Sequence, residues 1–260
     1  DKEKTIYYLL LAGEESMKSG ASSEALQFYE KAHELILDDK SQNLSKEQML
    51  DLEMRIADLY RACGKNEEAA EFFSKLIEAY TNHRFSKNEK KAKIRAGFSI
   101  LLAYVMIHFK RFFFKKKMNQ EMEILMKLTY EYGMCLISNN SRQFAIDTSA
   151  IVAKICRYNF KSSVPALRTF TTGSVLFGMT GLSLKTSQKM IEISEEAGIK
   201  NDLFGYTSLR MVNKMQKYFT GQWYFQEDEE SIIKQGLQVG SFWDIQTYMI
   251  YCGFNHIETG

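Results

Sequence analysis

Apolar residues recur along this chain every three or four positions, in stretches separated by short polar or glycine-containing turns. This period is typical of amphipathic α-helices that bury one face. In the first 82 residues the pattern predicts four helices, over residues 3–18, 22–37, 46–62 and 66–81. Short turns between helices of similar length favour antiparallel pairs. We therefore expect an all-α fold, a superhelix built from antiparallel helix pairs.

A small residue followed by glycine recurs after several of these apolar stretches. The pairs are Ser19-Gly20, Cys63-Gly64, Thr180-Gly181, Thr220-Gly221 and Thr259-Gly260. Successive pairs are separated by roughly 40 residues or about three times that distance, a period typical of helical-repeat arrays. Glycine suits such turns because it adopts left-handed backbone without steric cost.

Local signals for helix starts agree with this assignment. Ser45-x-x-Gln48 and Ser86-x-x-Glu89 have the form of capping boxes, in which the two side chains satisfy exposed backbone donors. The single proline, Pro165, is expected at a helix start.

The first 82 residues resemble the tetratricopeptide repeat. That motif has a small residue in its first helix, glycine at the turn, and then alanine, an aromatic residue and another small residue on the second helix. Matching positions are Ala12, Gly13, Gly20, Ala25, Tyr29 and Ala32, and then Ile56, Ala57, Tyr60, Gly64, Ala69 and Phe73. The resemblance implies that small residues allow close approach of paired helices while the aromatic residue fills the space against the next unit. The expected packing residues are Gly20, Ala25, Tyr29, Ala32, Gly64, Ala69, Phe73, Gly181, Gly221 and Trp223.

The regularity divides the chain into three expected sections. Residues 1–82 form two tetratricopeptide-like helix pairs, residues 83–158 are helical but irregular, and residues 159–260 return to helix pairs. Helices are expected over 88–112, 119–137 and 142–158 in the irregular section. Glycine turns in the last section include Gly240, after which Asp244 is expected to cap the final helix. Because that helix has no partner after it, we expect the chain to be a fragment of a longer repeat protein.

Composition adds few functional clues. With 34 basic and 32 acidic residues the net charge is +2, so no global field favours nucleic acid or an anionic membrane. Four widely spaced cysteines without a CxxC pair predict free thiols and a cytoplasmic location. If the chain is an adaptor, the cytoskeleton or a cilium is a more specific alternative. No apolar run is long enough to predict a transmembrane segment.

Motifs for catalysis are weak. Residues 173–180 resemble a phosphate-binding loop, but Met179 occupies the lysine position and no strand is expected before it. The four histidines form no i,i+3 or i,i+4 pair, and Glu227-Asp228-Glu229-Glu230 favours a solvated helix face over a metal site. We therefore predict no catalytic residue, no cofactor and no metal site in this chain.

The stretch His108-Phe-Lys-Arg-Phe-Phe-Phe-Lys-Lys-Lys117 is the sharpest local anomaly. One interpretation is a helix end, with cations complementing the helix dipole and phenylalanines in the core. The alternative is a polyanion-binding patch, in which basic and aromatic side chains contact nucleic acid or anionic lipid. Its candidate contacts are Lys110, Arg111, Lys115, Lys116 and Lys117.

Two further features bear on ligand binding. Trp223 is expected to pack against the preceding helix, with an exposed ligand platform as the alternative. If the array has a concave groove, the first helices of the regular units should line it. The expected lining residues are Tyr7, Met17, Asp51, Met54, Asp58, Arg168 and Thr171.

From about residue 120 the chain is similar to the helical tail of proteins that join a nucleotidyl cyclase or kinase to a regulatory ATPase, including soluble adenylyl cyclases. The similarity rests on "VPALRTF…GMTGLSLKTSQKMIEISEEAG" and "YFTGQWYFQEDEESIIKQGLQVG". It implies a non-catalytic segment that scaffolds or regulates a larger signalling protein involved in cAMP synthesis, through contacts with proteins or with other domains of the parent chain. The alternatives are a free-standing adaptor of a cytoskeletal or ciliary complex, and a polyanion-binding module.

Overall fold

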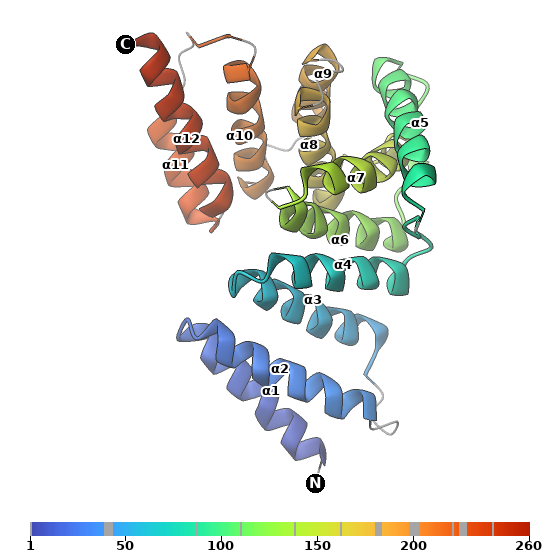
Figure 1. The fold of residues 1–260 in the computed structure, drawn as a ribbon, viewed down its shortest axis with the longest axis vertical. Coiled ribbons are helices and arrows are strands. Elements are labelled where there is room, and N and C mark those ends of the chain that lie inside the picture. Colours follow the sequence, from blue (N-terminus) through green and yellow to red (C-terminus); the bar gives the residue numbers. More distant parts are fainter. Residues whose placement is uncertain are drawn as a thin grey trace. The chain divides into compact units, whose positions relative to one another are not determined.

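The computed structural model shows a mostly helical chain, with 81% of the described residues in helices. It describes residues 2–38, 44–86, 88–109, 111–137, 139–161, 163–179, 184–197, 203–219, 221–223, 228–240 and 242–260. Over these ranges 12 helices pack in sequential pairs (Figure 1). The prediction of an all-α array of helix pairs is confirmed.

The helices follow one another with short connections. Their bounds are α1 Lys2–Lys18, α2 Ser22–Asp38, α3 Lys46–Ala62, α4 Asn66–Tyr80, α5 Glu89–His108, α6 Gln120–Leu136, α7 Ser141–Ile155, α8 Val164–Met179, α9 Leu184–Glu196, α10 Leu203–Phe219, α11 Glu229–Gln238 and α12 Phe242–Thr259. Two strands of two residues each, β1 Lys116–Lys117 and β2 Tyr158–Asn159, pair in parallel. None of the described helices is both long and apolar enough to cross a membrane.

The chain forms two compact units, each made of two separate stretches of sequence. The first comprises Asp1–Phe85 and Glu131–Ser141, and the second comprises Ser86–Tyr130 and Arg142–Gly260. The sequence-based division at residues 82 and 158 describes the regularity of the repeats and stays a prediction.

In the first unit α1 packs on α2, α2 on α3 and α3 on α4 (Figure 1). The turns inside the two pairs contain Gly20 and Gly64, whose φ angles are 80° and 76°. At the first turn the Ala21 amide donates to the Ser16 carbonyl at 2.8 Å, which satisfies a carbonyl at the end of α1. The helices enclose one apolar core: Ile6, Ala25, Leu26, Tyr29, Ile36, Leu52, Ile56 and Leu59.

The first expected capping box is confirmed and the second is wrong. At α3 the Ser45 hydroxyl accepts from the Gln48 amide at 3.2 Å, and the Gln48 side chain accepts from the Ser45 amide at 3.0 Å. At α5 the cap is Asn88, whose side chain accepts from the Lys91 amide at 3.0 Å. Asparagine is a strong helix cap, and here it stands directly before the first helical residue.

In the second unit α8 and α9 pair, and α10 packs on α8, α11 and α12 (Figure 1). Pro165 is the second residue of α8, so its expected place at a helix start is confirmed. Asp244 lies inside the first turn of α12 and is buried, and its carboxylate accepts a hydrogen bond from Ser208 of α10 at 2.5 Å. Its expected role as a cap of this helix stays a prediction.

The irregular section differs most from the helices expected there. The structure ends α5 at His108, four residues before the expected end. Phe114 then adopts a φ of 62°, a left-handed conformation that is strained for a bulky residue. Its amide donates to the Cys156 carbonyl at 2.8 Å, next to the pairing of β1 with β2. This long-range pairing shapes the connection between α5 and α6, which no local pattern predicts.

Candidate functional site

A groove of about 460 Å³ lies in the first unit, among α1, α2, the start of α3 and the segment before it. A volume of this size is within the range of ligand-binding pockets, about 300–1,000 Å³. Apolar and charged side chains line it: Leu10, Glu14, Tyr29, Ile36, Leu44, Glu47, Gln48, Asp51, Leu52 and Arg55. The groove therefore offers apolar contact area together with polar groups that can orient a bound segment.

Tyr29 contributes a buried polar atom to this groove. The residue is 2% exposed, and its ring packs on Gly13 of α1, where an added Cβ would lie 3.0 Å from the ring. The small residue of the first helix thus makes room for the aromatic residue of the second. The Tyr29 hydroxyl is buried without a hydrogen bond of good geometry, and the group that interacts with it is the Arg55 guanidinium. Arg55 therefore offsets part of the cost of burying this hydroxyl.

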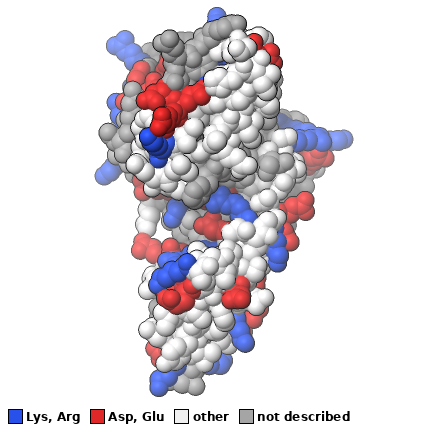
Figure 2. Space-filling view, turned by 90° about the vertical axis from the view of Figure 1, so that its left-hand side faces the viewer, with Lys and Arg blue, Asp and Glu red and all other residues white. Residues whose placement is uncertain are grey.

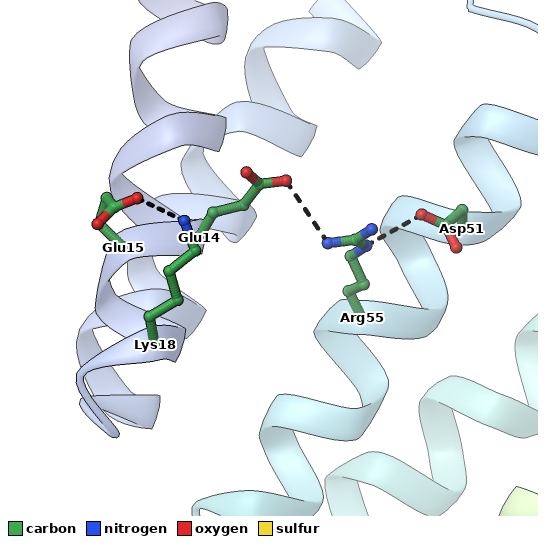
Figure 3. Close-up of polar contacts among 5 residues, drawn as sticks. All are labelled: Glu14, Glu15, Lys18, Asp51 and Arg55. Atoms are coloured by element: carbon green, nitrogen blue, oxygen red, sulfur yellow. Dashed lines mark hydrogen bonds and ion pairs between the residues drawn. The ribbon is translucent and has the colours of Figure 1, made fainter.

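Arg55 of α3 links the two sides of the groove (Figure 3). Its Nε donates to Asp51 Oδ2 at 2.9 Å, and its guanidinium lies 3.8 Å from Glu14 of α1. The hydrogen bond to Asp51 raises the pKa of Arg55 against the opposing effect of burial, and the nearby Tyr29 hydroxyl adds to the increase. All three charged side chains are about half exposed, so water and salt weaken these ion pairs.

The expected groove residues only partly match the observed lining. Asp51 lines the groove, whereas Tyr7 and Met17 of α1 are exposed outside it, and Leu10 and Glu14 lie in their place. Met54 and Thr171 are buried, and so do not line an open surface. Arg168 is half-buried in the second unit, and Asp58 lies 3.4 Å from Arg61 outside the groove. Of the residues expected on α3, only Asp51 lines the groove. On α1 the observed Leu10 and Glu14 lie on the same helix face as Tyr7 and Met17, three positions from them.

The expected packing residues fall in different surroundings. The side chains of Ala25, Tyr29, Ala32, Ala69 and Phe73 are buried. Trp223 is half-buried, and its indole nitrogen donates to the Tyr218 carbonyl at 3.1 Å, at the end of α10. The neighbouring Gly221 has a φ of 72°. Gly181 lies outside the described residues.

The basic stretch after α5 does not form a helix end. Arg111, Lys115, Lys116 and Lys117 are exposed, and the three lysines lie on or next to β1, six residues or more beyond α5. Because a helix dipole acts only over the last turn, the dipole interpretation of these lysines is wrong. Lys110 lies outside the described residues.

Two phenylalanines of this stretch have different roles. Phe114 packs edge-on against Phe160 at 5.4 Å between ring centroids, as expected for a core residue, whereas Phe112 is 68% exposed. A second pocket of about 370 Å³ lies here, lined by Arg111, Phe113, Phe114, Asn159, Phe160, Lys161, Ile193, Glu196 and Ala197. Exposed charges of both signs surround it, and it lies at the C-terminal end of α9. The pocket therefore has no clear preference for an anion, and the polyanion hypothesis stays a prediction.

A polar cluster in the second unit has the residue types of a catalytic site. Lys214 of α10 is buried and donates to Glu229 of α11 at 2.6 Å, and His256 lies 3.3 Å from the same carboxylate. Burial opposes ionisation of Glu229, but Lys214 and the other donors lower its pKa overall. Burial raises the pKa of the neighbouring Cys252 thiol to about 12. A nucleophilic cysteine needs a lowered pKa, so this cluster stabilises an ion pair and does not activate a thiol.

Metal-binding residues, surface charge and similarity to known proteins assign no chemistry to the described residues. Within the described ranges, no group of three or more histidine, cysteine, aspartate or glutamate side chains could hold a metal ion. On the face drawn in Figure 2, basic and acidic side chains lie interspersed, without a continuous field of one sign. A scan against protein-family models, a search of curated proteins and a search of solved structures each found no match for this chain.

Proposed function

We propose that this chain is a non-catalytic helical-repeat scaffold that binds a segment of a partner protein in the groove of its first unit. The observation that carries this proposal is the groove of about 460 Å³ itself, in which an apolar lining lies beside three carboxylates and one guanidinium. Stacked helix pairs commonly present grooves of this kind to partners.

The charges of the groove define the occupant further. Three carboxylates, on Glu14, Glu47 and Asp51, face a single guanidinium, on Arg55. The apolar lining from Leu10, Leu44 and Leu52 suits an aliphatic side chain. The structure thus favours an extended segment with an aliphatic anchor flanked by lysine or arginine, because its charges complement the carboxylates.

The test uses the whole chain and a fluorescent ten-residue peptide with a central leucine pair flanked by lysines. We expect binding that is detectable by anisotropy and lost when the lysines are replaced by glutamates.

Glu14→Gln and Glu15→Gln form a matched pair of variants. Both residues are on α1, but Glu14 lines the groove while Glu15 pairs with Lys18 at 2.7 Å (Figure 3). Glu14→Gln should weaken binding of the basic peptide, and Glu15→Gln should not. Equal effects of the two variants, or equal binding of the glutamate peptide, would refute the groove as the binding site.

We further propose, from the similarity of the sequence after residue 120 to cyclase-linked helical tails, that the scaffold belongs to a larger signalling protein such as a soluble adenylyl cyclase. The support is the two sequence phrases that include Pro165 to Gly198 and Gly221 to Gly240. Sequencing the complete transcript tests this, since a cyclase or ATPase domain in the same reading frame is the expected result. A reading frame without either domain would favour the free-standing adaptor.

A further inference from the structure

The helix α5 carries apolar side chains on two opposite sides. Ala96, Ala103, Met106 and Ile107 are buried on its inner side, where α5 packs against α9. On the other side Ile94, Phe98, Leu101 and Val105 are 74%, 68%, 60% and 39% exposed. Helices that are apolar all round are normally covered on all sides. The second unit covers only one side of α5, which lies at its edge (Figure 1).

Four of the exposed side chains form a line along the helix, here called the α5 stripe: Ile94, Phe98, Leu101 and Val105. Tyr104, 41% exposed, lies to one side of this line, and its ring packs on His108 at 4.5 Å between centroids. The residues of the stripe are separated by four, three and four positions, the spacing by which helices pair along a seam. At 1.5 Å per residue the stripe is about 16 Å long, which corresponds to about three turns of a partner helix. A membrane surface favours a broader apolar face, so the spacing favours a helix as the partner.

Gly97 gives independent support for close contact with a partner. It lies within α5, beside Phe98 of the stripe, and no described atom comes within 4 Å of the position that its Cβ would take. Nothing in the described part of the second unit therefore requires glycine there. Glycine in a helix interior costs about 1 kcal/mol relative to alanine. A helix that approaches the backbone closely at this position gives the glycine a structural role.

The charges beside the stripe define the partner's chemistry. Lys90, Lys91, Lys93 and Arg95 lie along the first half of α5, and all four are exposed. The only carboxylate of the helix, Glu89, is held by Lys93 at 2.7 Å and by Arg142 at 2.9 Å. A second copy of the chain would present the same cations and no additional carboxylate on this helix. A helix with glutamate or aspartate beside its apolar seam complements them.

We propose that the α5 stripe binds an amphipathic helix of a partner protein that has an aliphatic seam flanked by acidic residues. This surface belongs to the second unit, and the proposal does not depend on the groove of the first. Binding buries the apolar side chains of the stripe and places the partner backbone against Gly97. The acidic flank pairs with the cations of the first half of α5.

The experiment uses the whole chain and a synthetic 21-residue helical peptide, with leucines spaced alternately by three and four positions and glutamates beside them. A second peptide has lysines in place of the glutamates, and vesicles of phosphatidylserine and phosphatidylcholine are the third probe. Anisotropy should show binding of the glutamate peptide that weakens with added salt. The lysine peptide and the vesicles should bind at least tenfold more weakly.

Two variants and a control localise the binding. Phe98→Ser should weaken binding of the glutamate peptide at least tenfold, since it removes an exposed aromatic side chain from the stripe. Gly97→Met should weaken it to a similar extent by filling the space beside the stripe, although it adds apolar area and favours the helix. Ile257→Ser is the control, because Ile257 is 77% exposed on α12 and lies outside the stripe. Circular dichroism should show unchanged helix content in all three.

Each of four outcomes would overturn the proposal. The first is no binding of the glutamate peptide, and the second is binding that Phe98→Ser and Gly97→Met leave unchanged. The third is vesicle binding that exceeds peptide binding, which would assign the stripe to an anionic membrane. The fourth is a dimer in sedimentation velocity that Phe98→Ser dissociates, which would assign the stripe to a second copy of the chain.

Discussion

Replacing Gly236 by alanine should destabilise the second unit, against the usual effect of this substitution in a helix. Gly236 is buried in α11, and an added Cβ would lie closer than 3.0 Å to the Cδ1 and Cγ1 atoms of Ile245. The same Cβ would lie 3.1 Å from Thr207 of α10. Ordinary carbon–carbon contacts are about 3.5–4.0 Å, so the new methyl group must displace Ile245 or separate the helices.

The size of the effect follows from two opposing contributions. Alanine favours a helix over glycine by about 1 kcal/mol. Overpacking a core by one methyl group costs about 1–3 kcal/mol, and the overlap with Ile245 places this site at the upper end of that range. We therefore expect a net destabilisation of about 2 kcal/mol. Gly253→Ala in α12 is the matched control, since Gly253 is exposed and no described atom lies within 4 Å of its Cβ position. It should stabilise by up to about 1 kcal/mol.

Thermal melting followed by circular dichroism measures both variants, and hydrogen exchange of the α11 and α12 amides locates the change. The melting temperature should fall by about 4–8 °C for Gly236→Ala and rise by about 2–4 °C for Gly253→Ala. Ile245→Val removes one of the two overlapping carbons, so the double variant should be more stable than the sum of the single changes predicts. If Gly236→Ala proves as stabilising as Gly253→Ala, the close packing of α11 on α12 is wrong.

Two further predictions concern titration and thiol chemistry. The hydrogen bond to Glu30, together with burial, raises the pKa of Tyr60 to about 12. The contribution of this hydrogen bond to stability is therefore complete below pH 10 and is lost as the pH rises through about 12. Tyrosinate absorbance of wild type minus Tyr60→Phe should show no ionisation near pH 10, the ordinary value. In the native protein a thiol reagent should react in one fast phase with Cys63, the one half-buried cysteine. Cys63→Ser should abolish this fast phase. Fast reaction of more than one thiol would contradict the burial of Cys135, Cys156 and Cys252.

The first four helices could be predicted almost to the residue because their signals are local. The pattern predicted a helix over 46–62, and α3 spans Lys46–Ala62 behind the predicted capping box at Ser45. The glycine turns work in the same way, because the left-handed backbone at Gly20 and Gly64 depends on only a few neighbouring residues. Hydrophobic periodicity, capping residues and turn residues all indicate the same helix bounds here. Such agreement makes a helix predictable from its local sequence.

The path of the chain between α5 and α6 could not be predicted because its cause is distant in sequence. Lys116 pairs with Tyr158, and Phe114 donates to Cys156, so the segment is shaped by residues about 40 positions away. The groove was only partly predictable for a similar reason. Periodicity gives the apolar face of α1, but which exposed positions open on a cavity depends on the side chains of Tyr29 and Leu44 from other segments.

The α5 stripe shows a different limit of sequence reasoning. An apolar position at Ile94 or Phe98 has the same appearance in a pattern as the buried Ala96 or Met106, so the pattern cannot say which side of a helix is covered. Only the packing against α9 separates the two sides. The exposed apolar residues could therefore be recognised as a surface only once the structure showed which side of α5 is covered.

The groove and the α5 stripe require partners of opposite charge. Carboxylates outnumber the single guanidinium around the groove, whereas lysines and Arg95 outnumber Glu89 along the first half of α5. A single short segment cannot complement both surfaces, because the lysines that suit the groove would be repelled at α5. The two proposals therefore require two different segments, on one partner or on two. A mutation that abolishes binding at one surface should therefore leave binding at the other unchanged, as expected of a scaffold that joins separate segments.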